Sequence, residues 1–174
     1  GILLHTYKDH VIFERREVLT QAGQAFGVFT PYKNAWLKAL TPFHLKAYPV
    51  AIYAGTLAPL RPAHAQPVPT LAEIGFEPTN LAQLALPTGS SGGHQLFEDF
   101  IERIDHYDRA RDFPAVKGPS YLSTHLRFGT ISIRYVASVA YQMHLQGIAG
   151  ASTWLSELVW REFYHQVLAN FPHV

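Results

Sequence analysis

Five side chains within residues 154–164 have the chemistry to bind a flat, anionic ligand. At about 100° per residue of an α-helix, they fall on roughly one third of the circumference. They are Trp154, Glu157, Trp160, Arg161 and Tyr164. Aromatic rings stack on planar groups, a carboxylate accepts hydrogen bonds, and a guanidinium binds phosphate. The alternative is a half-buried helix in which Glu157 and Arg161 pair at i,i+4, worth only a few tenths of a kcal/mol.

One long helix must position these groups. Residues 154–164 contain no Gly or Pro, so we expect a helix from about residue 152 to about residue 170, ended by Phe171 and Pro172. Its other side carries the apolar residues Leu155, Leu158, Val159 and Phe163. The pattern predicts that one face packs in a core while the other borders a ligand.

Shorter elements precede this helix. The sequence predicts helices over residues 32–40 (capped by Thr30), 95–109, 122–127 and 133–146 (capped by Ser132). Residues 11–13 favour a β-strand because β-branched and aromatic side chains occur there. Repeated prolines, and the run Thr-Gly-Ser-Ser-Gly-Gly at 88–93, predict an irregular linker over residues 41–93.

The composition is that of a globular protein without a strong overall charge. Lys and Arg number 14 against 13 Asp and Glu, so any affinity for a highly charged partner must come from a local patch. No apolar run approaches the ~18–20 residues that span a bilayer, and the lack of Cys is compatible with a cytoplasmic location. The 10 His show no metal-ligand spacing, so no metal site is expected. Because the chain begins with Gly1, we expect a piece of a longer protein.

Three stretches resemble the DNA photolyase/cryptochrome family, most of all the bacterial class I deoxyribodipyrimidine (cyclobutane pyrimidine dimer) photolyases. The first is Trp-Leu-Ser-Glu-Leu-Val-Trp-Arg-Glu-Phe-Tyr at 154–164. The second comprises Arg-Asp-Phe-Pro-Ala at 111–115, Ser-Tyr-Leu-Ser at 120–123 and Leu-Arg-Phe-Gly-Thr-Ile-Ser at 126–132. The third is Val-Phe-Thr-Pro-Tyr-Lys-Asn-Ala-Trp at 28–36. They follow the family's order, and the resemblance is weakest over residues 44–93.

The resemblance implies a mainly α fold, namely the N-terminal half of the family's FAD-binding helical domain, preceded by the end of an α/β antenna domain and a long irregular linker. Residues 1–40 would end the antenna domain, 41–93 would form the linker, and 94–174 would begin the helical domain. The implied cofactors are FAD and, in the intact protein, a second antenna chromophore of the folate or deazaflavin type. The implied partner is DNA containing pyrimidine dimers, and the intact protein would be monomeric.

The resemblance also implies which residues would hold FAD. They are Tyr107, Pro119, Ser120, Tyr121, Leu122, Ser123, Trp154 and Arg161. The serines at 120 and 123 would contact the FAD phosphates, although a Ser-rich turn is otherwise a common helix cap. Pro119 and Tyr121 stand where the family usually has Thr and often has Arg. Pro119 therefore lacks a hydroxyl and an N–H that a phosphate would contact.

A partly overlapping set is implied to contact DNA. It comprises Arg111, Glu157, Leu158, Trp160, Arg161 and Tyr164. Glu157 and Trp160 would be catalytic, because the carboxylate would hydrogen-bond the dimer and the indole would lie against the flipped-out bases. Without the resemblance, Arg111 would be interpreted as an exposed residue paired with Asp112 or Asp108.

The implied function is light-driven, FAD-dependent repair of cyclobutane pyrimidine dimers by electron transfer to a flipped-out dimer. The main alternative is a cryptochrome, a flavin-binding blue-light photoreceptor without repair activity, and the combination of Glu157 with Trp160 favours repair. Another alternative is a flavin-free helical interaction module. The retention of Trp154 and of the serines at 120 and 123 argues against it.

We expect the 174-residue chain by itself to bind FAD weakly and to repair no DNA. The reason is that, in the family, the rest of the flavin pocket and the electron-relay tryptophans lie beyond the matched stretches. The measurement is the absorption spectrum of the purified chain. Stoichiometric yellow flavin after purification would contradict this expectation.

Overall fold

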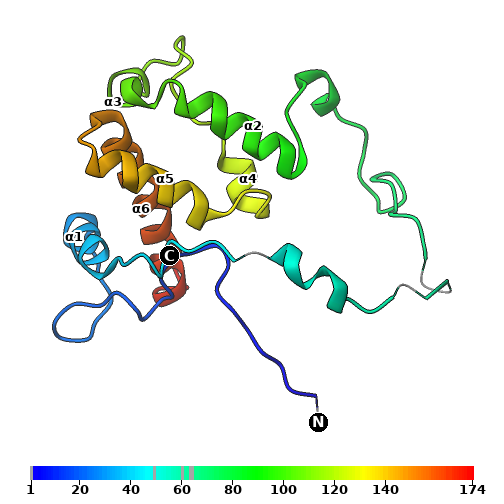
Figure 1. Ribbon diagram of the computed structural model, residues 1–174, viewed down its shortest axis with the longest axis horizontal. Helices are drawn as coiled ribbons and strands as arrows, with labels where there is room; N and C mark the ends of the chain where they lie inside the picture. The colour runs from blue at the N-terminus through cyan, green and yellow to red at the C-terminus, as the bar shows by residue number, and fades with distance from the viewer. Residues whose placement is uncertain (1, 49, 60, 63–64) are drawn as a thin grey trace. The chain divides into compact units, whose positions relative to one another are not determined.

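The computed structural model describes residues 2–48, 50–59, 61–62 and 65–174. Its α-helices are α1 (Phe29–Ala39), α2 (Gly89–Ile101), α3 (Tyr107–Ala110), α4 (Ser123–Phe128), α5 (Ile133–Leu145) and α6 (Ala149–Asn170) (Figure 1). Short 3₁₀ helices are η1 (Val50–Thr56), η3 (Leu81–Leu84) and η4 (Ile104–His106). The described ranges contain no β-strand, so the mainly α prediction is confirmed. None of the helices in these ranges is both long and apolar enough to cross a membrane.

The chain divides into two compact units, one of residues 1–47 with 87–174 and one of residues 48–86. The smaller unit contains η1 and η3. The predicted irregular run at 88–93 is wrong, because α2 already begins at Gly89. Gly92 has a packing role there, since a Cβ atom on it would lie 2.5 Å from the carbonyl carbon of Pro87. The division into an antenna domain, a linker and a flavin domain stays a prediction.

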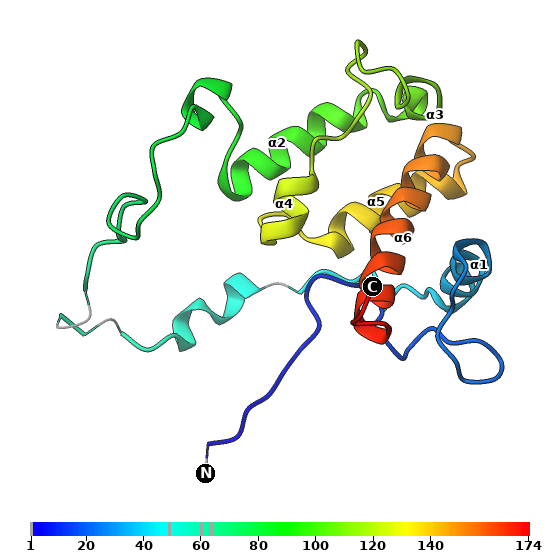
Figure 2. The ribbon, with the colours of Figure 1, turned by 180° about the vertical axis from the view of Figure 1, so that it is seen from behind.

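The larger unit is built on α6. This helix packs against α1, α3, α5 and η4. Figures 1 and 2 show α1, α3 and α5 beside it. The predicted core stripe is confirmed, because the four apolar residues named for it are all buried. At the start of α6, a Cβ atom on Gly150 would lie 1.8 Å from the carbonyl oxygen of Ile104. Only glycine allows α6 to approach η4 so closely.

Several predicted helix ends are wrong. α1 begins with Val28 at the N-cap, and Thr30 lies inside the helix instead of capping it. Ser132 is at the N-cap of α5 but makes no side-chain capping hydrogen bond. The helix predicted over residues 95–109 is divided into α2, η4 and α3. The predicted end of α4 is confirmed, because Gly129 follows it in the left-handed conformation, with φ of 67°.

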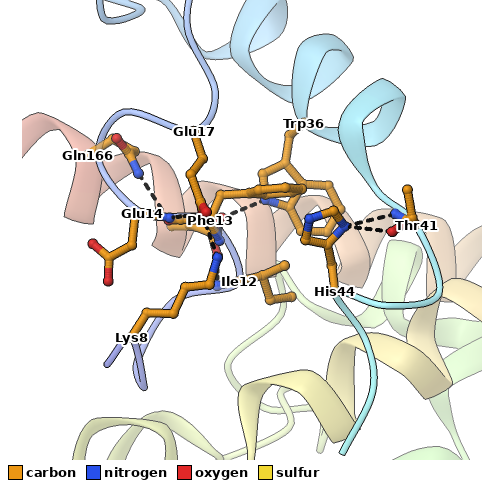
Figure 3. A network of polar contacts seen from close by, with 10 residues as sticks. Lys8, Ile12, Phe13, Glu14, Glu17, Trp36, Thr41, His44 and Gln166 are labelled. Atoms are coloured by element: carbon orange, nitrogen blue, oxygen red, sulfur yellow. Dashed lines mark hydrogen bonds and ion pairs between the residues drawn. The ribbon is translucent and has the colours of Figure 1, made fainter. Parts of the chain in front are cut away.

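The predicted strand at residues 11–13 does not form, because side chains of α6 satisfy its backbone groups. The carboxylate of Glu162 accepts hydrogen bonds from the N–H groups of Ile12 (2.6 Å) and Phe13 (3.0 Å). One turn further along α6, the amide of Gln166 donates to the carbonyl of Phe13 (3.1 Å), as Figure 3 shows. Because buried backbone groups need hydrogen-bond partners, these contacts replace those of a neighbouring strand.

Glu162 also fixes α1. The indole Nε1 of Trp36 donates to Oε1 of Glu162 (2.6 Å). The rings of Trp36 and Phe13 are nearly perpendicular, at a centroid distance of 5.6 Å and an interplanar angle of 85° (Figure 3). Glu162 is only 2% exposed, and burial raises the pKa of its carboxyl while the N–H donors oppose that shift. One buried side chain therefore joins α6, α1 and the N-terminal segment.

We expect Glu162→Gln to lower the free energy of unfolding by about 1.5–3 kcal/mol, because an amide cannot accept all three hydrogen bonds that the carboxyl group accepts. The measurement is denaturant unfolding at neutral pH. Glu98→Gln is the matched control, since Glu98 is exposed on α2 and its substitution should cost less than about 0.5 kcal/mol. Equal stability of the two variants would show that the Glu162 contacts contribute nothing.

Candidate functional site

Three predicted site residues, Tyr107, Arg111 and Glu157, lie close together and are called the Arg111 cluster. Nη1 of Arg111 lies 2.5 Å from Oε1 of Glu157. The guanidinium carbon of Arg111 lies 5.7 Å from the centre of the Tyr107 ring. Tyr107 begins α3, Arg111 follows the end of α3, and Glu157 comes from α6. The predicted flavin contact, DNA contact and catalytic carboxylate are therefore neighbours.

The Arg111 cluster borders solvent. The side chains of Arg111 and Glu157 are 31% and 34% exposed. Their hydrogen bond raises the pKa of Arg111 against the opposing effect of burial. Burial, and then the charge of Glu157, raise the pKa of Tyr107, so its hydroxyl stays protonated at neutral pH. Arg111 also lies 3.4 Å from Asp112, which confirms the pairing expected without the family resemblance, but the contact with Glu157 is shorter.

Trp160 and Tyr164 belong to an aromatic stack near the surface. The ring of Phe29 in α1 lies parallel to that of Trp160, at a centroid distance of 3.6 Å and an interplanar angle of 10°. The ring of Tyr164 lies 5.6 Å from that of Trp160 at 24°, and Tyr164 is 58% exposed. The rings of Trp160 and Tyr164 are accessible. Phe29, which was not among the predicted site residues, covers one face of Trp160.

Trp154 lies in the core. It is 3% exposed, and its ring packs against those of Phe97 (5.8 Å) and Phe100 (4.8 Å) on α2. Leu158, predicted to contact DNA, is 6% exposed because it belongs to the apolar stripe of α6. The structure therefore contradicts a surface position for Leu158.

Arg161 does not pair with Glu157, so the alternative of an i,i+4 ion pair is wrong. Its Nη1 donates to the carbonyl of His10 (2.6 Å) and its Nη2 to the carbonyl of Leu126 (3.1 Å). Burial lowers the pKa of this arginine. The residues of the predicted ligand face of α6 therefore contact different neighbours. Arg161 joins α6 to the N-terminal segment and to α4.

The predicted phosphate-binding turn precedes α4. Leu122 is fully buried and anchors the turn, whereas Tyr121 and Ser123 are exposed. The N–H of Leu122 lies within 3.5 Å of the Ser120 hydroxyl oxygen. The carbonyl of Pro119 points toward Arg103, from which it accepts a hydrogen bond (2.9 Å). Because the side chain of Leu122 is fully buried, this residue could contact a cofactor only through its backbone.

Sequence reasoning missed Glu162 and Gln166. The available signal was their spacing, because both continue the stripe of Leu155, Leu158, Val159 and Phe163 at intervals of three and four residues. A polar residue within a core stripe must find hydrogen-bond partners when it is buried. The pattern would have indicated buried polar contacts, although not the groups that make them.

The arrangement offers two kinds of binding chemistry. The Arg111 cluster provides a cation for a phosphate and a carboxylate that accepts hydrogen bonds. The aromatic stack provides flat surfaces for bases. Within the described part of the chain, no group of three or more His, Cys, Asp or Glu could hold a metal ion.

We expect a double-mutant cycle of Arg111→Gln and Glu157→Gln to give a coupling free energy of about 0.3–1 kcal/mol, because the pair is partly exposed. The coupling should fall as salt is added. The control cycle is Arg111→Gln with Asp112→Asn, whose coupling should be near zero because Asp112 is 77% exposed. Denaturant unfolding measures both cycles, and equal couplings would contradict the preference of Arg111 for Glu157.

Comparisons with known proteins give similarity over the whole chain. The deoxyribodipyrimidine photo-lyase of Vibrio cholerae is 36% identical over 186 residues, covering 100% of this chain and 37% of that protein. The protein of the same name from Halobacterium salinarum is 31% identical over 178 residues, covering 97% of this chain and 35% of that protein. No family model matches the chain.

A solved photolyase structure is similar to this chain in fold. The crystal structure of a bacterial class III photolyase from Agrobacterium tumefaciens superposes with a TM-score of 0.69 and 27% identity, over 94% of this chain and 34% of that one. The chain thus spans about a third of the length of the curated relatives it matches. In both sequence and fold, this chain is homologous to a part, about one third, of these photolyases.

Proposed function

We propose that this chain contributes the lesion-facing part of the flavin-binding helical domain to a deoxyribodipyrimidine photolyase, which repairs cyclobutane pyrimidine dimers in DNA with light. The observation that carries the proposal is the Arg111 cluster. Its ion pair, 2.5 Å long and about one-third exposed, joins the residues proposed to contact the DNA backbone and the dimer. The proposal agrees with the names of relatives that are similar over nearly the full chain.

The donor set of the turn at 120–123 fits the phosphates of FAD. The hydroxyls of Ser120 and Ser123 are hydrogen-bond donors, and Ser123 is exposed. Tyr107, a member of the Arg111 cluster, contributes a buried ring against which a flat cofactor would lie. When bound, reduced FAD supplies the light-driven electron that opens the cyclobutane ring.

The residues of this chain would bind and orient the lesion. Glu157 would accept hydrogen bonds from the dimer once Arg111 turns to a DNA phosphate. Trp160 would lie against the flipped-out bases through the part of its ring that Phe29 and Tyr164 leave exposed. Tyr164, the exposed end of the stack, would extend this aromatic surface. Arg161 would support the site by holding α6 in place rather than by touching the lesion.

The test uses a photolyase-length protein that contains these residues, loaded with FAD. We expect Trp160→Ala to weaken binding of an oligonucleotide carrying a thymine dimer by roughly 5- to 150-fold, because one stacking contact is lost. Binding to the undamaged oligonucleotide should be unchanged. Trp160→Phe is the matched control, which keeps a ring and should retain most of the affinity.

The same preparation separates repair from photoreception. Dimer cleavage under blue light by the unsubstituted protein, and none in the dark, is the expected result. A protein that carries reduced flavin, absorbs blue light and leaves the dimer intact would be a cryptochrome, and the proposal of repair would then be wrong.

A further inference from the structure

Arg103 fastens the turn that precedes α4. It follows the end of α2, and its Nε donates to the carbonyl of Lys117 (2.9 Å) while its Nη2 donates to that of Pro119 (2.9 Å). Its Nη1 donates back to the carbonyl of Asp99 (3.2 Å) in α2, and Nη2 lies 3.2 Å from the Asp99 carboxylate. One guanidinium therefore joins two carbonyls of the turn to α2.

Other contacts hold the same turn. Nζ of Lys117 lies 2.7 Å from the carboxylate of Asp99. The backbone of Gly118 lies so close to α3 that a Cβ atom on it would be 2.6 Å from the carbonyl oxygen of Ala110. Leu122 is fully buried at the far end. The turn is thus attached to α2, to α3 and to the core.

This attachment decides which way the backbone donors point. In a trans peptide the N–H and the C=O point in opposite directions. Because the carbonyl of Pro119 points toward Arg103, the N–H of Ser120 points away from Arg103. The next residue, Tyr121, has a φ of 57°, a left-handed conformation that non-glycine residues keep only when their surroundings fix it.

We propose that Arg103 is a positioning residue for a diphosphate group held by the turn at 120–123. The inference rests on the proposed flavin site and names a residue that site does not include. Arg103 itself does not touch the ligand, since its donors serve Lys117, Pro119 and Asp99. It holds the turn in the conformation in which the Ser120 N–H points away from Arg103. A site that is ordered before binding loses less conformational entropy when the ligand arrives.

The first test measures amide hydrogen exchange at residues 117–122 in the 174-residue chain. We expect Arg103→Gln to accelerate exchange there by roughly tenfold, because hydrogen bonds from a charged donor are lost. Arg109→Gln is the matched control and should change nothing, since the side chain of Arg109 is 84% exposed. Equal exchange in the two variants would overturn the role of Arg103.

The second test titrates inorganic pyrophosphate and follows the amide resonances of residues 120–123. We expect Arg103→Gln to weaken pyrophosphate binding by roughly 3- to 10-fold relative to Arg109→Gln. Faster exchange with unchanged pyrophosphate affinity would overturn the positioning role. If the unsubstituted chain binds no pyrophosphate at the turn, and a photolyase-length protein freed of FAD binds none there either, the proposed flavin site is wrong, whereas the exchange result still decides whether Arg103 orders the turn.

A conservative variant separates a local effect from unfolding. Arg103→Lys keeps the charge beside Asp99 but cannot reach both carbonyls of the turn at once. We expect it to keep the circular dichroism of the unsubstituted chain and to accelerate exchange only at residues 117–122. Slow exchange at these residues in a folded Arg103→Lys variant would show that the forked contact is dispensable.

Discussion

A buried carboxylate sets the position of α1 and of the N-terminal segment on α6. Glu162 accepts hydrogen bonds from Ile12, Phe13 and Trp36, and an unpaired carboxylate in that place would cost several kcal/mol. Trp36 and Phe29 are seven residues apart in α1, two turns of the same face. Once Trp36 is joined to Glu162, Phe29 is brought over Trp160, so the aromatic stack depends on this buried contact.

The site geometry is consequently a property of the packing around α6 and not of that helix alone. Each charged or aromatic group on its mixed face meets a different neighbour: Glu157 meets Arg111, Trp160 meets Phe29, and Arg161 meets two backbone carbonyls. Glu157 and Trp160 remain partly exposed beside these neighbours. These are the groups left available to a ligand.

The sequence predicted what depends on neighbouring residues along the chain and failed where distant groups compete. Periodicity placed the apolar stripe of α6 in the core, and three motifs indicated the family before any fold was known. Periodicity could not show that Glu157 would prefer an arginine 46 residues away to Arg161 on its own helix. Nor could β-propensity at residues 11–13 show that Glu162 and Gln166 would satisfy that backbone.

The mutual pairing of Arg111 and Glu157 has a consequence for the proposed selectivity. Arg111 and Glu157 pair with each other, so a ligand that engages only one of them takes the other's shorter partner away. A phosphate alone would bind Arg111 and leave Glu157 without its cation. A neutral base alone would bind Glu157 and leave Arg111 with only its longer contact to Asp112. A flipped-out lesion on a DNA strand offers a phosphate to Arg111 and hydrogen-bond donors to Glu157 at the same time. Breaking the ion pair is therefore best compensated by a ligand that carries both features.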